Sequence, residues 1–250
     1  MAQKTKIVVL AAGKGTRMAD ELPKVLVTLH GKPMIKYLLD AVKASGVDEK
    51  PIIVVGHKRE DVMRELGDGY LYAVQEEQLG TGHAIMCTEN LLKGSTENVM
   101  VLQSDHPFIT PETIKKLAEE HIATNATITM ATVKLPDFND WRKIFYTNFG
   151  RIVRDKNNRI TKIVEFKDAS ESEKNIKEVN PSYFCFEANW LWKNLKRLTT
   201  NNNQKQYYQT DLIKLAMDEN EKIESIDVTP REGLAANSKE ELEILERVAV

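Results

Sequence analysis

The 250-residue sequence contains little cysteine and no paired histidine motif. Its two cysteines, Cys87 and Cys185, lie far apart and outside any CxxC spacing. Neither a disulfide framework nor a zinc site is therefore indicated, and both residues are expected to be reduced, buried thiols. The five histidines form no HxxxH or HExxH pair, so no histidine-based metal site is indicated either.

The sequence also lacks an excess of one charge and a long hydrophobic run. Its 35 basic and 37 acidic side chains give a formal net charge of −2, which argues against a large basic surface for nucleic acid but leaves room for a local anion site. The longest apolar run near the start, residues 7–12, is too short to cross a membrane. We expect a cytoplasmic protein without a targeting segment, and without nucleic-acid or membrane partners.

The first half of the chain alternates short β-branched runs with amphipathic stretches. Strands are expected at residues 7–10, 51–55, 71–74 and 99–102, and helices at residues 34–45, 59–66 and 81–92. Strands separated by helices imply right-handed βαβ units and a mostly parallel sheet that is covered on both faces. The first half is therefore predicted to be a doubly wound, Rossmann-like α/β fold of the nucleotide-binding type.

In the second half of the chain, some of the expected strands follow one another in the sequence without a helix between them. Thr110 and Pro111 are typical of a helix start, and residues 155–158 form a hairpin signal between two strands. The expected strands are 127–133, 150–154, 160–166, 183–186 and 223–228, and the expected helices are 111–124, 190–198, 210–218 and one from Ser238. Without a repeat or linker to divide it, the chain is predicted to form one domain, residues 1–250, with a mixed sheet and a small β-rich lobe.

A glycine-rich, basic loop follows the first strand. Gly13 and Gly15 allow a tight turn at the strand's carboxyl end, where ligands of open α/β sheets bind, and their N–H groups can face a phosphate. Lys14, Arg17 and Lys24 add positive charge. The loop is not a Walker A loop and lacks the third glycine of the dinucleotide fingerprint. A tight turn with solvated lysines is the alternative, but the combination favours a phosphate site.

With residues 22–24, this loop resembles the signature of the sugar-1-phosphate nucleotidylyltransferases. Residues 75–84 resemble the uridine-binding segment of the N-acetylglucosamine-1-phosphate uridylyltransferase family, the amino-terminal domain of a bifunctional bacterial enzyme. Further motifs follow in that family's order, at residues 105–107, 150–151, 163–169, 178–180, 207–211 and 237–238. The resemblance spans essentially the whole chain. The bifunctional relatives continue into a hexapeptide-repeat β-helix that acetylates glucosamine 1-phosphate and forms the trimer; these residues contain no such repeat, so we expect neither that activity nor that trimer interface.

The resemblance implies Mg²⁺-dependent transfer of a uridylyl group from UTP to N-acetylglucosamine 1-phosphate, giving UDP-N-acetylglucosamine and pyrophosphate for the cell envelope. Two alternatives stay open. One is the same chemistry with another sugar 1-phosphate or with dTTP. The other is a non-catalytic nucleotide-binding regulatory module, against which the retention of Arg17, Lys24 and Asp105 argues. The sequence indicates no oligomeric state.

The reaction requires a phosphate and an α-phosphorus to be brought together while their charge is neutralised, a task for a divalent cation. By the resemblance, Asp105 and Asn237 are the Mg²⁺ ligands, offering a carboxylate and a carbonyl oxygen. By themselves, Asp105 also fits a turn and Asn237 a helix start. The sugar phosphate is already largely ionised at neutral pH, so no general base is needed. We assign Arg17 and Lys24 as catalytic, stabilising the triphosphate and the transition state.

The other expected site residues form a nucleotide set and a sugar set. The nucleotide set is Leu10, Ala11, Ala12, Gly13, Lys14, Gly15, Thr16, Gln75, Gly80, Thr81 and Ser104. Gln75 offers a donor and an acceptor to the uracil edge, and Gly80 allows the backbone to approach. The sugar set, implied by the resemblance, is Gly150, Glu165, Asn180, Tyr208 and Thr210. Glu165 also fits the polar face of a strand.

The chain departs from the family's pattern around these motifs. Gln103 and Ser104 stand where the family commonly carries an aromatic residue and a glycine, Gln206 stands in place of a glutamate, and Ala235 in place of a glycine. His106 occupies a usually apolar position and is expected to pack rather than to catalyse. These departures bear on the choice of sugar and base more than on the type of reaction.

Overall fold

The structure is a computed structural model that describes residues 4–15 and 22–248. Its strands are β1 Thr5–Ala11, β2 Thr28–Leu29, β3 Lys32–Pro33, β4 Ile52–Val55, β5 Leu71–Val74, β6 Asn98–Gln103, β7 Ile128–Lys134, β8 Gly150–Arg154, β9 Ile160–Val164, β10 Glu178–Asn180, β11 Phe184–Glu187 and β12 Ile223–Val228. Its helices are η1 Lys24–Leu26, α1 Met34–Ser45, α2 Arg59–Leu66, α3 Thr81–Met86, α4 Glu89–Leu92, α5 Pro111–Thr124, η2 Asp140–Lys143, α6 Ile144–Asn148, α7 Glu171–Lys174, α8 Ala188–Leu195, α9 Asp211–Asp218 and α10 Lys239–Val248.

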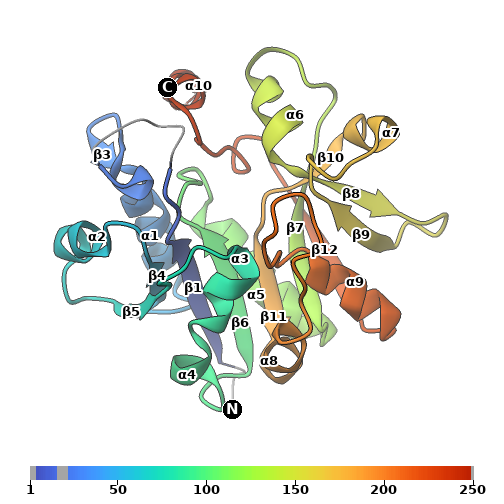
Figure 1. Cartoon of the computed structure of the whole chain (residues 1–250), viewed down its shortest axis with the longest axis horizontal. Coiled ribbons are helices and arrows are strands. Elements are labelled where there is room, and N and C mark those ends of the chain that lie inside the picture. The colour runs from blue at the N-terminus through green and yellow to red at the C-terminus, as the bar shows by residue number, and fades with distance from the viewer. Residues whose placement is uncertain (1–3, 16–21, 249–250) are drawn as a thin grey trace.

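One mixed sheet runs through the protein (Figure 1). Within the described ranges it has ten strands in the order β5-β4-β1-β6-β11-β7-β10-β8-β9, with β12 paired to β7. The first four strands of this order are parallel, the pairs that follow are antiparallel, and β12 is parallel to β7. The predicted α/β fold with a mixed sheet is therefore confirmed, while the organisation as a single domain stays a prediction.

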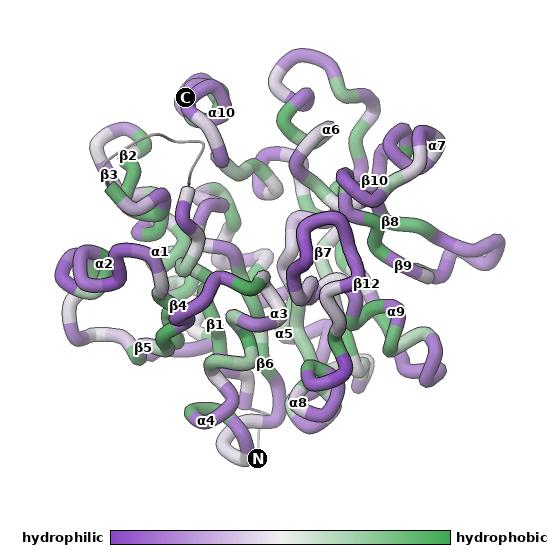
Figure 2. Tube along the Cα trace, in the orientation of Figure 1, coloured by the Kyte–Doolittle hydropathy of each residue, from purple (hydrophilic) through white to green (hydrophobic). Residues whose placement is uncertain are grey.

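Strand β1 shows why the sheet is buried on both faces. Ile7 and Val9 pack into one apolar cluster with residues of α1 and α5, whereas Val8 and Leu10 pack into a second cluster with residues of α3 and α8. Successive side chains of a strand point to opposite faces, so a continuous apolar run is suited to a strand covered on both sides. Figure 2 shows hydrophobic colouring along the central strands and hydrophilic colouring in the peripheral loops.

Helices α1, α2 and α5 begin and end as predicted. At the start of α5, the Thr110 hydroxyl accepts a hydrogen bond from Thr113 N over 3.2 Å. The single helix expected over residues 81–92 is wrong, because α3 ends at Met86 and α4 begins at Glu89. The Thr88 hydroxyl donates to the Ile85 carbonyl over 2.7 Å and so competes for an acceptor of the helical ladder.

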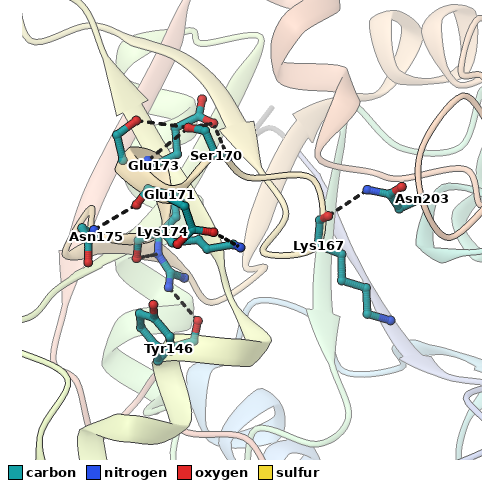
Figure 3. A network of polar contacts seen from close by, with 10 residues as sticks. Tyr146, Lys167, Ser170, Glu171, Glu173, Lys174, Asn175 and Asn203 are labelled. Carbon is teal, nitrogen blue, oxygen red and sulfur yellow. Dashed lines mark hydrogen bonds and ion pairs between the residues drawn. The ribbon is translucent and has the colours of Figure 1, made fainter.

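Other differences from the sequence prediction lie mainly in the β-rich lobe. The strand expected to reach Phe166 ends at Val164, and the short elements α6, α7 and β10 were not predicted. Helix α7 is a single turn held by a capping box, in which Ser170 and Glu173 bond to each other's backbone N–H groups (Figure 3). Cys185 is buried as expected, whereas Cys87 is only half-buried.

His121, on α5, gives the fold a pH dependence. Its Nδ1 lies 2.9 Å from the Thr129 hydroxyl, and burial lowers its pKa from 6.5 to about 4. As the pH falls from 6.5 towards 4, His121 becomes protonated in the unfolded chain but stays neutral in the folded protein. Folding stability therefore decreases over this pH range. Between about pH 7 and pH 5, His121 should lower the free energy of unfolding of the wild type by about 2 kcal/mol. His121→Gln should abolish this part of the decrease. Urea unfolding at several pH values measures this, and parallel curves for variant and wild type would contradict it.

Candidate active site

A cavity of about 500 Å³ lies where β1 and β6 end, the edge at which open α/β sheets bind ligands. Most of the residues predicted for the nucleotide and the catalytic centre line it: Leu10, Ala12, Gly13, Lys14, Gly15, Lys24, Gln75, Gly80, Thr81, Ser104 and Asp105. Ala11 does not line it; its side chain is buried in the cluster on the other face of the sheet, because side chains alternate along β1. Thr16 and Arg17 lie outside the described residues.

A second cavity, of about 310 Å³, adjoins the first. It brings together the whole predicted sugar set and the predicted metal pair: Gly150, Glu165, Asn180, Tyr208, Thr210, Asp105 and Asn237. Thr81, Gln103, Asp105 and Gln206 line both cavities. The two cavities therefore meet beside Asp105, as joining a nucleotide to a sugar phosphate requires.

Lys24 lies between the two predicted metal ligands. Its Nζ forms an ion pair with Asp105 Oδ2 and donates a hydrogen bond to Asn237 Oδ1 over 2.7 Å. Burial alone would raise the pKa of Asp105, but the Lys24 ammonium and further contacts hold this pKa below its ordinary value. Asp105 is therefore ionised, and the two oxygens converge on a single positive charge.

Hydrogen bonds from the C-terminal segment hold Asn237 beside Asp105. Ala236 N donates to the Asp105 carbonyl over 3.4 Å, and Asn237 N donates to Glu241 Oε2 over 2.5 Å. The other oxygen of Glu241 accepts from Asn148 Nδ2 over 2.6 Å. Asn148 lines the second cavity, so Glu241 ties the predicted metal ligand to the sugar side of the site.

The donor set fits a hard divalent cation. A carboxylate oxygen and an amide carbonyl oxygen are ligands of the kind that Mg²⁺ prefers, and Mg²⁺ retains several waters, so few protein ligands are needed. In the part of the chain that the structure describes, no three His, Cys, Asp or Glu residues cluster as a metal site. The convergence of Asp105 and Asn237 on the Lys24 ammonium shows that both oxygens can serve one cation.

Two glycines allow backbone segments to close around the first cavity. Gly15 has φ +61°, and a Cβ there would lie 2.6 Å from Lys24 Cβ. Gly80 has φ +109°, and a Cβ there would lie 2.6 Å from the Tyr207 carbonyl oxygen. Both the backbone conformation and the close approach therefore require glycine.

Gln75 is buried with a fixed amide orientation. Its Nε2 donates to the Gly80 carbonyl over 3.0 Å and lies 3.1 Å from His83 Nδ1. A flipped amide would place oxygen against the carbonyl oxygen, so Oε1 is the atom left to accept a hydrogen bond from a ligand.

Glu165 lines the second cavity rather than a solvated strand face. Thr210 Oγ1 donates to Glu165 Oε1 over 3.0 Å, and burial raises the pKa of the Glu165 carboxyl. A Cβ at Gly150 would lie 2.7 Å from Ile163 Cγ2 and 3.3 Å from Glu165 Oε1. The carboxyl thus lies directly against the Gly150 backbone.

Neighbouring segments fix the other walls of the second cavity. Asn180 Oδ1 accepts from Ser182 N over 2.9 Å, while the Tyr208 hydroxyl accepts from Gln204 Nε2 over 2.7 Å. Burial raises the pKa of Tyr208 to about 12, so its hydroxyl stays protonated. Asn203 Nδ2 donates to the Lys167 carbonyl over 2.8 Å, which ties the loop before Tyr208 to the segment after Glu165 (Figure 3).

His106 lies beside the centre but is packed. It is buried, its ring meets Tyr183 and Phe149 edge-on, and its Nδ1 lies 2.9 Å from the Tyr183 hydroxyl. Burial lowers the pKa of His106 to about 4. A neutral, enclosed imidazole agrees with the packing role expected from the sequence.

Several cavity residues were missed by the sequence prediction: Val25, Gln78, Ala84, Asn148, Phe149, Ser182, Gln204 and Gln209. No spacing in the sequence marks Gln204 or Gln209, because the segment is not extended: both residues lie in turns, and Lys205 has φ +52°.

Two cavities that meet at one cationic centre on a Rossmann-like sheet suit a nucleotidyl transfer site. The family model and the relatives described next identify the protein as a sugar-1-phosphate nucleotidylyltransferase. Residues 7–210 match the family described as MobA-like NTP transferase domain. The chain belongs to that family, and within it to the branch of the GlmU proteins, so the resemblance found in the motifs is confirmed.

Two relatives illustrate the match. "Bifunctional protein GlmU" of Desulfotalea psychrophila is 39% identical over 238 residues, covering 94% of this chain and 68% of the relative. The protein of the same name from Clostridium novyi is 40% identical over 244 residues, covering 96% of this chain and 51% of the relative. The chain thus spans about half the length of several curated relatives it matches.

A solved structure agrees with the fold. A crystal structure from Bacillus anthracis, described as a glucose-1-phosphate thymidylyltransferase in complex with a sucrose, superposes with a TM-score of 0.78 at 17% identity, covering 98% of this chain and 95% of that one. At this identity the likeness concerns the fold alone.

Across the described residues, no helix has the length and apolar character needed to cross a membrane.

Proposed function

We propose that this protein transfers the uridylyl group of UTP to N-acetylglucosamine 1-phosphate. An oxygen of the sugar phosphate forms a bond to the α-phosphorus, the bond from that phosphorus to the bridging oxygen breaks, and pyrophosphate leaves with the electron pair. The observation that carries the proposal is the meeting of the two cavities at Lys24, Asp105 and Asn237. The GlmU relatives support the choice of substrates.

Catalysis in this proposal is positioning and charge stabilisation. The attacking phosphate is already ionised near neutral pH, so no side chain has to remove a proton. Lys24 neutralises charge on the α-phosphate as it develops, and its partly buried position strengthens that attraction. The N–H groups of residues 13–15 cradle the pyrophosphate, and Thr16 and Arg17 are proposed to contribute to the same phosphates.

Asp105 and Asn237 are proposed to hold Mg²⁺ in the place that the Lys24 ammonium takes in the structure, with Lys24 then facing the α-phosphate. When bound, this ion neutralises phosphate oxygens and favours an in-line arrangement of the attacking and leaving groups. Asp105 supplies the negative charge, and Asn237, held by Glu241, supplies a neutral oxygen beside it.

For the base, Gln75 Oε1 accepts the N3–H of uracil, while the Gly80 backbone lies close to the same edge. Cytosine carries no proton on N3, so this contact disfavours CTP. Thymine shares the N3–H group, which keeps dTTP as an alternative nucleotide. For the sugar, Gly150, Glu165, Asn180, Tyr208 and Thr210 are proposed to contact the ring and its substituents.

A competition experiment tests the choice of substrates. Pyrophosphate release is measured with UTP, dTTP, CTP and GTP, each combined with N-acetylglucosamine 1-phosphate, glucose 1-phosphate and galactose 1-phosphate. UTP with N-acetylglucosamine 1-phosphate is expected to give the highest kcat/KM. A higher value for another pair would overturn the substrate assignment while leaving the reaction type in place.

Gly150→Ala is expected to weaken binding of the sugar phosphate. The new Cβ would press on Ile163 and on the Glu165 carboxyl, so the KM for the sugar 1-phosphate should rise about tenfold, a loss of about 1.4 kcal/mol, with the KM for UTP unchanged. Gly69→Ala is the matched control, because a Cβ at Gly69 meets nothing within 4 Å. Steady-state kinetics separate the two constants. An equal rise in the KM for the sugar 1-phosphate and the KM for UTP would contradict a specific role of Gly150 in binding the sugar phosphate.

A further inference from the structure

His83 lies behind Gln75 and lines neither cavity. Its Nδ1 is 3.1 Å from Gln75 Nε2, whereas Gln75 itself lines the first cavity and is only 3% exposed. His83 can therefore act on a nucleotide in that cavity only through Gln75, and the proposed function leaves it without a role.

The hydrogen bonds of Gln75 determine which nitrogen of His83 carries the proton. The Gly80 carbonyl accepts from Gln75 Nε2 over 3.0 Å and from Ala84 N over 3.1 Å, so the amide atom that faces it is the nitrogen. An amide nitrogen carries two protons and accepts no hydrogen bond. Its second proton is therefore donated to His83 Nδ1, and the neutral imidazole carries its own proton on Nε2.

The start of helix α3 holds both partners of this amide in place. Gly80 directly precedes α3, and His83 lies in its first turn. Gly82 N, between them, donates to the Tyr207 carbonyl over 2.8 Å, and the rings of His83 and Tyr207 lie with their centroids 6.5 Å apart. Two acceptors on one fixed stretch of backbone thus face the two protons of the Gln75 amide.

The orientation of this amide decides which base it can bind. With both Nε2 protons donated, Gln75 Oε1 is left for the ligand, and an acceptor there pairs with the N3–H of uracil. Cytosine N3 is itself an acceptor, so the opposite orientation, which presents Nε2, favours cytosine. That orientation would also place Oε1 against the Gly80 carbonyl oxygen and the His83 lone pair, so the surrounding acceptors disfavour it twice.

We propose that His83 is a positioning residue that selects the base of the nucleotide by fixing the amide orientation of Gln75. The inference rests on the proposed function, since it concerns the side chain that is proposed to read uracil. A residue at position 83 without an acceptor would leave one Nε2 proton buried and unpaired. The orientation that reads uracil would then lose its advantage over the opposite one.

The binding test compares His83→Leu and His83→Asn with wild type. Leucine removes the acceptor, whereas the Oδ1 of asparagine can take the place of Nδ1. Dissociation constants for UTP and CTP are measured by calorimetry with MgCl₂ and without a sugar phosphate. Wild type is expected to prefer UTP. His83→Leu should reduce this preference about tenfold by weakening UTP and not CTP, and His83→Asn should restore most of it.

The proton on the imidazole is observed directly by NMR. Long-range ¹H–¹⁵N spectra of the labelled protein are recorded at about pH 8, where imidazole is ordinarily neutral. The signals of His83 are those that disappear in His83→Asn. We expect His83 to be protonated on Nε2 and unprotonated on Nδ1, and a proton on Nδ1 would overturn the proposal.

Two further variants separate base selection from local damage. Thr88→Val is the matched control, because Thr88 is buried just after α3, bonds the Ile85 carbonyl through its hydroxyl and lines neither cavity. It should leave the preference for UTP over CTP unchanged. In a Gln75→Met background, adding His83→Leu should not lower the preference further, because His83 acts through Gln75. A further loss in the double variant would overturn the proposal.

Equal weakening of UTP and CTP in His83→Leu would show a purely structural role, and an unchanged preference would also overturn the proposal. If wild type binds UTP over CTP but forms no pyrophosphate with any sugar phosphate, the proposed function fails and the role of His83 stands. If wild type transfers the uridylyl group and His83→Leu keeps the wild-type preference, the function stands and the inference fails. Folded wild type that does not distinguish UTP from CTP overturns the inference directly.

Discussion

Asp105→Asn is expected to lower turnover about a thousandfold while the protein remains folded. The substitution keeps the shape of the side chain and an oxygen that can accept from Lys24, but it removes the negative charge beside Lys24 and Asn237. That charge is the one full carboxylate we assign to the divalent cation. The result is measured as kcat for pyrophosphate release at saturating UTP and sugar phosphate, with circular dichroism to confirm folding.

Asp48→Asn is a matched control for this variant. Asp48 pairs with Lys6 over 2.5 Å, and the two side chains are as little exposed as those of Lys24 and Asp105. The Lys6–Asp48 pair lies outside both cavities, so breaking it affects stability in a similar way without changing the site. Full activity in Asp48→Asn with near-complete loss in Asp105→Asn assigns the effect to the site. Retention of about a tenth of wild-type turnover or more by Asp105→Asn would remove Asp105 from its proposed role.

Lys24→Met is expected to lower kcat about a hundredfold, with a much smaller change in the KM for either substrate. The reason is that the ammonium is proposed to act on charge that develops during the transfer, rather than on the bound ground state. Lys6→Met, which removes the equivalent lysine of the Lys6–Asp48 pair, is the control. A higher KM for UTP with an unchanged kcat would show that Lys24 binds the triphosphate without acting on the transition state.

Much of the fold could be predicted because local patterns agree with tertiary burial. The apolar runs of β1, β4 and β6 are buried on both faces, α1 and α2 each end at a glycine, and α5 begins with the Thr110 cap. The break between α3 and α4 could not be predicted from periodicity, because it involves a local contact: the Ile85 carbonyl accepts hydrogen bonds from both the backbone N and the hydroxyl of Thr88. Short elements such as α7 depend on local caps rather than on apolar spacing.

The site was harder to predict than the fold, because its centre joins distant parts of the chain. Asp105 and Asn237 lie 81 and 213 residues beyond Lys24, and only the folded chain brings all three together. The motif order indicated that these residues share a site, but not that the lysine bridges the two oxygens. The fixed amide of Gln75 has no sequence signature, since it depends on neighbours in space.

The central claim is that Lys24, Asp105 and Asn237 form the centre of a divalent-cation-dependent uridylyl transfer. Its most direct test is pyrophosphate release by the purified protein from UTP and N-acetylglucosamine 1-phosphate, with MgCl₂ or with EDTA. We expect equal amounts of pyrophosphate and UDP-N-acetylglucosamine with Mg²⁺, and neither product with EDTA or with either substrate omitted. Folded protein that forms neither product with Mg²⁺ present would contradict the claim.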